Sequence, residues 1–207
     1  MSRRAWLAVG ALAVLLAPAL APATIEEQRA RLPPPATCTD PVEGVWMSHK
    51  FEPSQQLWYV FTLRIRRGEG DRLQGDISSH AWSGTDQDPE PPPCRPGRSH
   101  WVVRMSAEGT VRGPRIDFWG TRWWPEQTFC GSAPGPGSYN LDHFSGAIDP
   151  TLLEFQSVNN DGGDLVDDPT VFRRVQCLDP VAPPHPYVTP PAFHPRRGRG
   201  CGRGPGR

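Results

Sequence analysis

Three copies of one short unit, in which apolar residues flank a glycine, constrain the fold of this chain more than any other feature. The copies lie at residues 73–77, 111–116 and 144–148. Two further apolar runs, 152–158 and 171–175, are joined by a stretch of Gly, Asp and Asn. These residue types supply the positive φ angles that hairpin turns need. The unit therefore predicts consecutive antiparallel strands.

Residues 57–66 show the clearest strand pattern, an alternation with a period of two. Every second residue from Leu57 to Ile65 is apolar, and the other face becomes basic at Arg64 and Arg66. Such a strand has one face in a core. Similar stretches recur along the chain without a helical period, and glycine tolerates the sharp bends of a closed barrel. We therefore predict an all-β fold, an antiparallel meander that closes into a barrel of about eight strands.

The chain begins with the features of an export signal. Arg3 and Arg4 precede an apolar run at 7–20, and small residues at 21–23 offer a cleavage site. The arginine pair also resembles a twin-arginine signal, although ordinary n-region charge is the preferred explanation. We expect a secreted or periplasmic protein with no membrane span after signal removal. The predicted segments are a signal peptide at 1–23, a linker at 24–37, the β-barrel domain at 38–178 and a disordered Pro/Arg/Gly-rich tail at 179–207.

Charge is unevenly distributed although the whole chain is formally neutral. From Cys38 to Cys177 there are 13 basic and 19 acidic residues, which gives a net charge of −6. The residues after Cys177 have five arginines against Asp179, a net charge of +4. An acidic body argues against nucleic-acid binding, which needs clustered cations. The basic tail predicts contact with a polyanionic envelope surface.

The cysteines predict two disulfides. Cys38 and Cys177 bracket the predicted barrel, whereas Cys94 and Cys130 lie in segments rich in Pro and Gly. Four cysteines allow three pairings, of which we favour Cys38–Cys177 and Cys94–Cys130. Cys201 is left over, either free or intermolecular. Because no C-x2-C pair is present, the sequence predicts no zinc site, and we expect no other metal or cofactor.

Residues in the first and last predicted strands resemble the signature of a known family of barrels. Gly44-Val45-Trp46, together with Arg173 or Arg174, resembles the signature of the calycin barrels, the lipocalins and avidins. The resemblance implies that Trp46 packs beneath one of these arginines and closes the barrel base. Arg173 is preferred if its face, shared with Val171 and Val175, points inward. The chain departs from lipocalins in lacking a predicted helix after the barrel, and no biotin-site motif of avidins is present, so no ligand is implied.

Aromatic residues give the candidate binding site. Trp58, Trp82, Trp119, Trp123 and Trp124 are predicted either to line a ligand pocket or to fill the barrel core. Tyr139 and His143 belong to the densest polar and aromatic cluster, residues 139–143. The first hypothesis is a non-enzymatic binding protein that holds a small apolar or sugar-like ligand in a Trp-lined barrel.

Two other functions compete with ligand binding. No catalytic pattern is present, so enzymatic activity is left uncertain, but Asp142, His143 and Glu154 would suit a secreted hydrolase. A cell-envelope protein with a filled barrel and no ligand is the other alternative.

Four histidines and one acidic stretch offer candidate metal ligands, and each has a simpler role. His49, His80, His100 and His143 are unpaired in sequence, which favours ordinary solvated or hydrogen-bonded roles over a metal site. Residues 157–168 align in part with a calcium loop, from Ser157 through Asn159, Asp161 and Gly162 to Asp168. A hairpin turn accounts for the same composition and is preferred.

Overall fold

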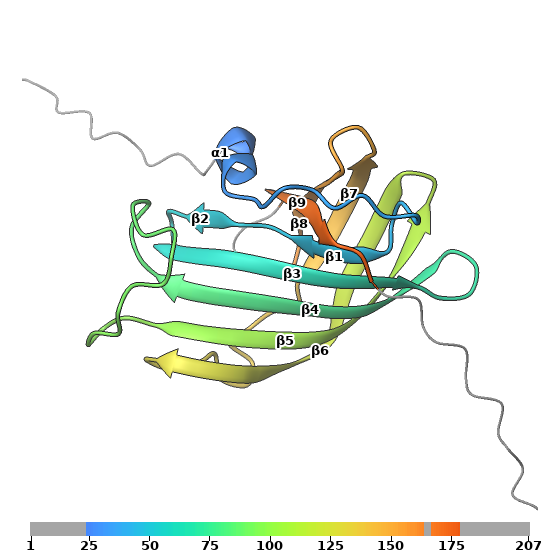
Figure 1. Cartoon of the computed structure of the whole chain (residues 1–207). Coiled ribbons are helices and arrows are strands. Elements are labelled where there is room, and N and C mark those ends of the chain that lie inside the picture. Colours follow the sequence, from blue (N-terminus) through green and yellow to red (C-terminus); the bar gives the residue numbers. More distant parts are fainter. Residues whose placement is uncertain (1–23, 164–166, 179–207) are drawn as a thin grey trace, which may run out of the picture.

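The computed structural model describes residues 24–163 and 167–178, and its main feature is one antiparallel sheet that closes on itself (Figure 1). The strands are β1 (Gly44–Met47), β2 (Lys50–Glu52), β3 (Leu57–Arg67), β4 (Arg72–Ser83), β5 (His100–Arg112), β6 (Arg115–Cys130), β7 (His143–Asp149), β8 (Glu154–Asn159) and β9 (Asp168–Gln176). Consecutive strands pair from β3 to β9, and β1 pairs with both β9 and β3. The result is a closed eight-stranded barrel with one extra strand, β2, which confirms the predicted all-β barrel.

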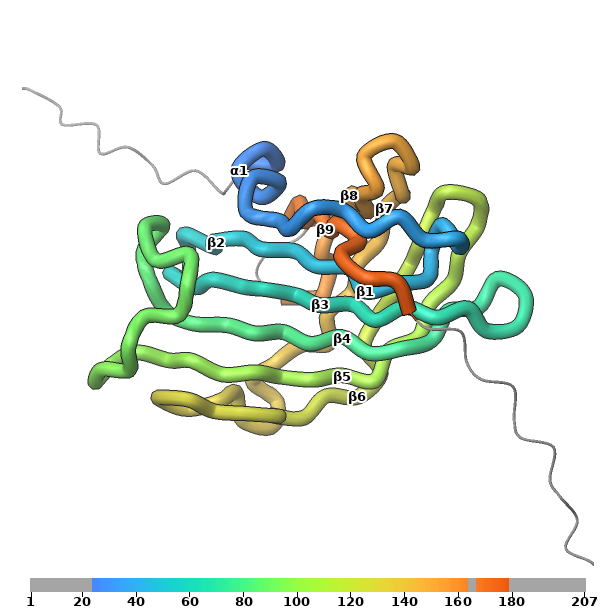
Figure 2. Tube along the Cα trace, in the orientation of Figure 1, coloured from blue at the N-terminus to red at the C-terminus, as the bar shows by residue number. Residues whose placement is uncertain are grey.

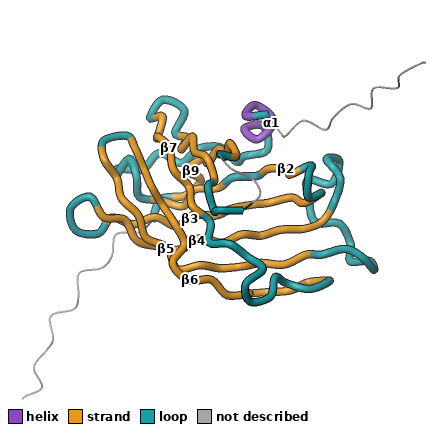
Figure 3. Tube along the Cα trace, turned by 180° about the vertical axis from the view of Figure 1, so that it is seen from behind, coloured by secondary structure: helices purple, strands orange, loops and turns teal. Residues whose placement is uncertain are grey.

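Residues 57–66, for which the alternation predicts a strand, form most of β3 in the barrel wall. Phe61, Leu63 and Ile65 of β3 are buried in the main core, which also receives alternate residues of the other strands. Hairpin connections lie at the two ends of the strands (Figure 3). The last predicted hairpin, β8 with β9, is present, and residues 164–166 of its turn lie outside the described part of the chain.

The second glycine unit, residues 111–116, does not lie within one strand. The sequence favours a turn at 107–109, before this unit, but β5 runs on to Arg112, and the turn is formed by Gly113 and Pro114. Gly113 has a φ of 59°, a conformation that favours glycine. Gly109 lies within β5, where a Cβ atom would come within 2.2 Å of the Asp117 carbonyl oxygen. Both positions require glycine, for different reasons, and the sequence pattern does not separate the two reasons.

Strand β6 is longer than predicted. The Pro and Gly content of residues 125–138 favours a loop, yet β6 continues through Pro125 to Cys130. It pairs with β7 only over Arg115–Trp119 and beyond that point only with β5. The missing amide hydrogen of Pro125 is tolerated because this half of β6 is a sheet edge, and three register shifts interrupt its pairing with β5.

The segment 24–37, predicted to be an extended linker, contains the helix α1 (Ile25–Ala30), which lies beside β2 and β9 (Figure 2). Thr24 and Glu27 form a capping box that satisfies the amides at the helix start. The Gln28 side chain accepts from Val171 N (3.0 Å) and donates to Pro169 O (3.0 Å). The side-chain amide of Gln28 thus makes the hydrogen bonds with β9 that a neighbouring strand would otherwise make. The segment is too short to show a helical period in its sequence, so the sequence does not indicate this role.

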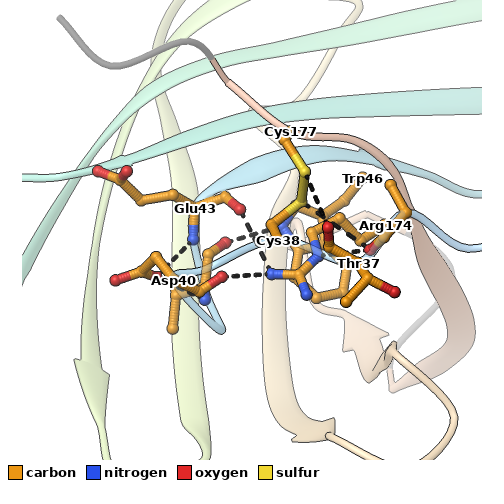
Figure 4. The surroundings of a disulfide bond; sticks show 9 residues. Thr37, Cys38, Asp40, Glu43, Trp46, Arg174 and Cys177 are labelled. Carbon is orange, nitrogen blue, oxygen red and sulfur yellow. Dashed lines mark hydrogen bonds between the residues drawn. A yellow bond between two sulfur atoms is a disulfide. The ribbon is translucent and has the colours of Figure 1, made fainter.

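One end of the barrel, the base, is closed by Arg174, whose side chain is 3 % exposed (Figure 4). The Arg174 guanidinium lies 5.4 Å from the Trp46 ring centre and donates to the carbonyls of Ala36 and Asp40. Trp46 itself donates its indole hydrogen to Val42 O (2.9 Å). Arg174, rather than the preferred Arg173, is the partner of Trp46. Arg173 lies on the outer side, where it donates to Glu154.

Both favoured disulfides are present. Cys38–Cys177 ties the segment before β1 to the end of β9, with Cα atoms 5.6 Å apart, and Cys94–Cys130 ties the β4–β5 connection to the end of β6. The predicted signal peptide, the basic tail and Cys201 lie outside the described residues. Among the described residues, no helix has the length and apolar character needed to cross a membrane.

Candidate binding site at the barrel mouth

A cavity of about 300 Å³ lies at the end of the barrel opposite the base. It opens between the first residues of β3 and β9, whereas Trp46 and Arg174 lie toward the other ends of these strands. We call this end the mouth. Its lining consists of Lys50, Glu52, Gln55, Tyr59, Phe61, Ser138, Tyr139, Asn140, Asp142, Asn159, Asp161, Gly163 and Asp168.

The mouth exists because backbone pairing between strands is incomplete at this end of the barrel. Strand β1 pairs with β9, but β2 pairs with β3 alone, so β2 and the first half of β9 share no backbone hydrogen bonds. The ion pair of Lys50 and Asp168 bridges this seam. Lys50 is 3 % exposed although it carries an ammonium group. A buried ion pair thus takes the place of backbone pairing at the mouth.

Asp142 is the most deeply buried acid of the mouth, at 2 % exposure. Tyr139 donates its hydroxyl to one carboxylate oxygen (3.0 Å), and the Asn159 side-chain amide donates to the other (3.3 Å). Burial raises the pKa of Asp142 to about 7, although the two hydrogen bonds act in the opposite direction. The carboxyl group therefore changes its charge near neutral pH.

The other polar groups of the mouth respond to the same low-dielectric surroundings. Burial lowers the pKa of Lys50 to about 8, and the nearby charges of Glu52, Asp142 and Asp161 limit the decrease. Burial also raises the pKa of Tyr59, so its phenol stays neutral. The Tyr59 hydroxyl donates to Gln55 (2.6 Å). At neutral pH the mouth thus presents an ammonium group, neutral hydroxyls and amides, and carboxylates.

Aromatic rings form the inner part of the mouth. The rings of Tyr59 and Phe61 lie parallel, with centres 5.5 Å apart. Tyr139 packs against Trp101 and Trp123, each at 5.6 Å between ring centres. These contacts hold Tyr139 in place beneath the polar rim. The cavity therefore combines flat apolar surfaces with convergent polar groups, the composition typical of small-molecule sites.

The predicted tryptophans do not line the mouth. Trp58 and Trp82 lie on the outer face of the barrel beneath the β4–β5 connection, where their indole hydrogens bond to Thr85 O (2.7 Å) and Asp88 O (3.0 Å). They form a small second core with Phe51, separate from the barrel core that the alternative interpretation assigned to them. The predicted Trp-lined pocket is thus replaced by one lined with tyrosine, phenylalanine and charged side chains.

The tryptophans of β6 face different ways. Phe118 points into the core, so its neighbour Trp119 faces outward, near His143 (ring centres 6.0 Å apart). A register shift between Gly120 and Arg122 then turns Trp123 toward the interior, behind Tyr139. Trp124 is exposed. Of the predicted ligand-binding residues, only Tyr139 lines the cavity, and Trp123 supports it.

The proposed hydrolase residues are not brought together. Glu154 is 1 % exposed and bound by Arg29 (2.8 Å) and Arg173 (2.9 Å) outside the barrel wall. It begins β8, whereas Asn159, the partner of Asp142, ends it, so the two carboxylates are separated by roughly 16 Å along the strand. His143 faces Asp117 on the outside, with 3.6 Å between Nε2 and the carboxylate. Glu154 instead fastens α1 to the barrel.

The calcium alignment also fails. The Ser157 hydroxyl donates to Thr170 O (2.8 Å) within the barrel, and Asp168 is paired with Lys50. Asn159 and Asp161 do reach the mouth, as part of the cavity lining. Within residues 24–163 and 167–178, no three His, Cys, Asp or Glu side chains gather to hold a metal ion.

Sequence reasoning missed most of the mouth, including Lys50, Glu52 and Tyr59. A signal for two of them was present. Counting in steps of two from the inward-facing Trp46 leads to Ser48, Lys50 and Glu52, all of which are buried. A lysine and a glutamate on the inner face of a barrel strand indicate that the barrel is polar at that end.

Comparisons of the chain with protein-family models, with curated proteins and with solved structures give no match. We therefore infer function from the mouth itself.

Proposed function

We propose that this chain is an exported binding protein that holds a small, polar, sugar-like molecule in the barrel mouth without covalent chemistry. The observation that carries the proposal is the cavity of about 300 Å³ in which charged, amide and hydroxyl groups converge over aromatic rings. Of the two ligand types expected from sequence, the polar one suits this lining. A purely apolar ligand would leave the remaining hydrogen-bonding capacity of Lys50 and Asp142 unused in a site shielded from water, which is unfavourable.

Hydroxyl-bearing ligands suit this set of side chains. Each ligand hydroxyl can donate to a carboxylate such as Asp161 and accept from Lys50 or from an amide such as Asn140. The faces of Tyr59 and Phe61 offer the flat surface on which the apolar side of a sugar ring packs. A packed barrel, as in a purely structural envelope protein, would not be expected to leave this cavity.

Export is supported by the cysteines and by the predicted signal. Two disulfides in a chain of this size fit an oxidising compartment, such as the periplasm or the cell exterior. The calycin resemblance is part of the same proposal. The up-and-down barrel with Trp46 beneath Arg174 supports it, and binding at an open barrel end is what that resemblance implies.

A titration of the full chain with neutral mono- and disaccharides, followed by isothermal calorimetry, tests the proposal. We expect at least one sugar to bind, and the double variant Lys50→Met/Asp142→Asn to weaken it at least roughly tenfold, because the Lys50 ammonium donor is lost and one Asp142 carboxylate oxygen is replaced by an amide NH2, which cannot accept. Trp124→Ala, on the exposed half of β6, is the matched control and should bind normally. Equal binding by the double variant, or no binding by any sugar of the panel, would count against the proposal.

A further inference from the structure

Two histidines that are distant in sequence meet on the outer face of the barrel. His80 of β4 and His100 of β5 place their Nε2 atoms 2.7 Å apart. The strand register explains the meeting, because His80 lies opposite Val102 while His100 lies opposite Trp82. The two histidines are therefore diagonal neighbours on the face opposite the buried Ala81–Trp101 pair. No short spacing in the sequence reveals this arrangement.

Neighbouring aromatic rings hold both imidazoles in position. The ring of Phe129 stacks on His100, with centres 4.1 Å apart and planes 20° from parallel. The ring of His80 lies 5.1 Å from that of Trp82, which is itself buried beneath the β4–β5 connection. Fixed rings reduce the entropy lost when both nitrogens bind one ligand. The pair is thus preorganised rather than two freely rotating surface histidines.

The short distance between the two Nε2 atoms limits the protonation states that the pair can adopt. If both imidazoles are neutral, one Nε2–H donates to the other nitrogen. If both were protonated, two positive charges would face each other at hydrogen-bonding distance. Burial lowers the pKa of His80, with a further decrease from the charge of His100, and burial lowers the pKa of His100 as well. The neutral form, whose lone pairs can coordinate a cation, is therefore favoured at neutral pH.

We propose that His80 and His100 bind one late first-row divalent cation through their Nε2 atoms, with Cu²⁺ preferred over Ni²⁺ and Zn²⁺. Imidazole suits these ions, and affinity for a given nitrogen site is highest for Cu²⁺. Metal–nitrogen bonds of about 2.0–2.1 Å require the two nitrogens to separate to roughly 3 Å, a small rotation from their present positions. Water fills the remaining coordination positions, since no third ligand of the described chain completes the site.

The position of the pair gives a bound cation a structural consequence. His80 and His100 lie at the two ends of the β4–β5 connection, which covers Trp58 and Trp82. A cation held by both residues would clamp the base of this connection, and Cys94–Cys130 already ties the connection to β6. Because only the folded chain brings the two histidines together, binding should also raise the unfolding temperature. The proposal does not depend on the nature of the ligand in the mouth.

Calorimetric titration of the full chain with Cu²⁺, Ni²⁺ and Zn²⁺ tests this inference. We expect a Cu²⁺ site that is weakened roughly tenfold or more in both His80→Gln and His100→Gln. His143→Gln is the matched control, since that histidine also lies on the outer face, on β7, and should leave the site unchanged. His185 and His194 of the tail are present in every variant, so any binding that they contribute cancels in the comparison. Unchanged Cu²⁺ binding in the His80→Gln/His100→Gln double variant would overturn the proposal.

A measurement on the unmodified chain guards against variants that fail to fold. Paramagnetic Cu²⁺ at the pair should broaden the NMR signals of the Trp82 indole and the Phe129 ring, which flank the two histidines. The indole signal of Trp46, buried at the barrel base, should stay sharp. Equal broadening of all three, or none at Trp82 and Phe129, would contradict a site at His80 and His100.

Discussion

The base and the mouth of the barrel are built largely from the same strands, yet their buried charged groups differ in how fully they are paired. At the base, Arg174 is surrounded by carbonyl oxygens and the Trp46 ring, and the Asp40 carboxylate is paired with Arg67 at 2.7 Å. At the mouth, four acidic side chains and one lysine line an open cavity. Burial there shifts the pKa of Asp142 up and that of Lys50 down. The base satisfies its charges, whereas the mouth leaves them partly uncompensated.

This difference indicates that the two ends of the barrel have different roles. A buried cation with several acceptors and an aromatic face stabilises the closed base, and removing it leaves those acceptors unsatisfied. Buried ionisable groups with shifted pKa values cluster at functional sites more often than elsewhere. We therefore assign stability mainly to the base and ligand binding to the mouth.

The largest effect is expected from the disulfide at the base. In the chain-entropy model, the 139-residue separation of Cys38 and Cys177 gives about 5 kcal/mol, against about 4 kcal/mol for the 36 residues between Cys94 and Cys130. Replacing each pair by serine should therefore lower the unfolding free energy more at the base, as measured by urea denaturation. A larger loss from the Cys94–Cys130 pair would contradict the assignment of stability to the base.

Next in size is the effect of removing a buried cation. Arg174→Met should destabilise the fold by about 3–5 kcal/mol, because buried carbonyl acceptors lose their donor and Trp46 loses its partner. Lys50→Met, the matched change at the mouth, should cost less, since burial already disfavours its ammonium group. Chemical denaturation of both variants makes the comparison. Equal losses would mean that the mouth is as important for stability as the base.

A pH-dependent effect of intermediate size is expected at Asp142. The folded chain holds a proton on this carboxyl up to about pH 7, whereas its ordinary pKa is 3.8, so its contribution to stability decreases as pH rises from about 4 to about 7 and is constant above. The total is at most about 4 kcal/mol. Asp142→Asn removes this titration, so the variant should gain stability relative to the original chain over that range.

Urea denaturation of both chains between pH 4 and pH 8 measures the difference. A difference that stays constant with pH would show that Asp142 is not desolvated in the folded state. Asp40, whose pKa is lowered at the base, supplies the opposite case. Its contribution is present above its unfolded pKa and is lost as pH falls, so Asp40→Asn should lose stability relative to the original chain as pH rises through the acid range.

The smallest effect is expected on the exposed half of β6. Trp124 is 36 % exposed and faces away from the core, so Trp124→Ala should change the unfolding free energy by about 0.5 kcal/mol or less. Thermal denaturation suffices to measure it. A loss comparable to that of Arg174→Met would indicate that this edge is covered by something other than solvent.

The sequence predicted the barrel well because its signals are local. The alternation on β3 and the Gly/Asp/Asn hairpin between β8 and β9 each follow from neighbouring residues. Errors arose where one residue type has two uses. Gly109 permits a close backbone approach and Gly113 a turn, and Pro125 lies on a sheet edge rather than in a loop.

The mouth was less predictable because it depends on long-range register. Lys50 and Asp168 meet only after the barrel closes, and Asn159 reaches Asp142 only when β7 and β8 pair. The bulge after Gly120 places Trp123 on the face opposite to that of Trp119, which no count of alternation from the start of β6 anticipates. Helix α1 was missed because its stability comes from docking against β9 rather than from a helical period.

Native mass spectrometry of the full chain purified from its own host tests the assignment of binding to the mouth most directly. We predict one retained small polar molecule, present on the original chain and on Trp124→Ala but absent from Lys50→Met/Asp142→Asn. A chain that is reproducibly free of any such molecule, or a molecule retained equally by the double variant, would contradict the assignment.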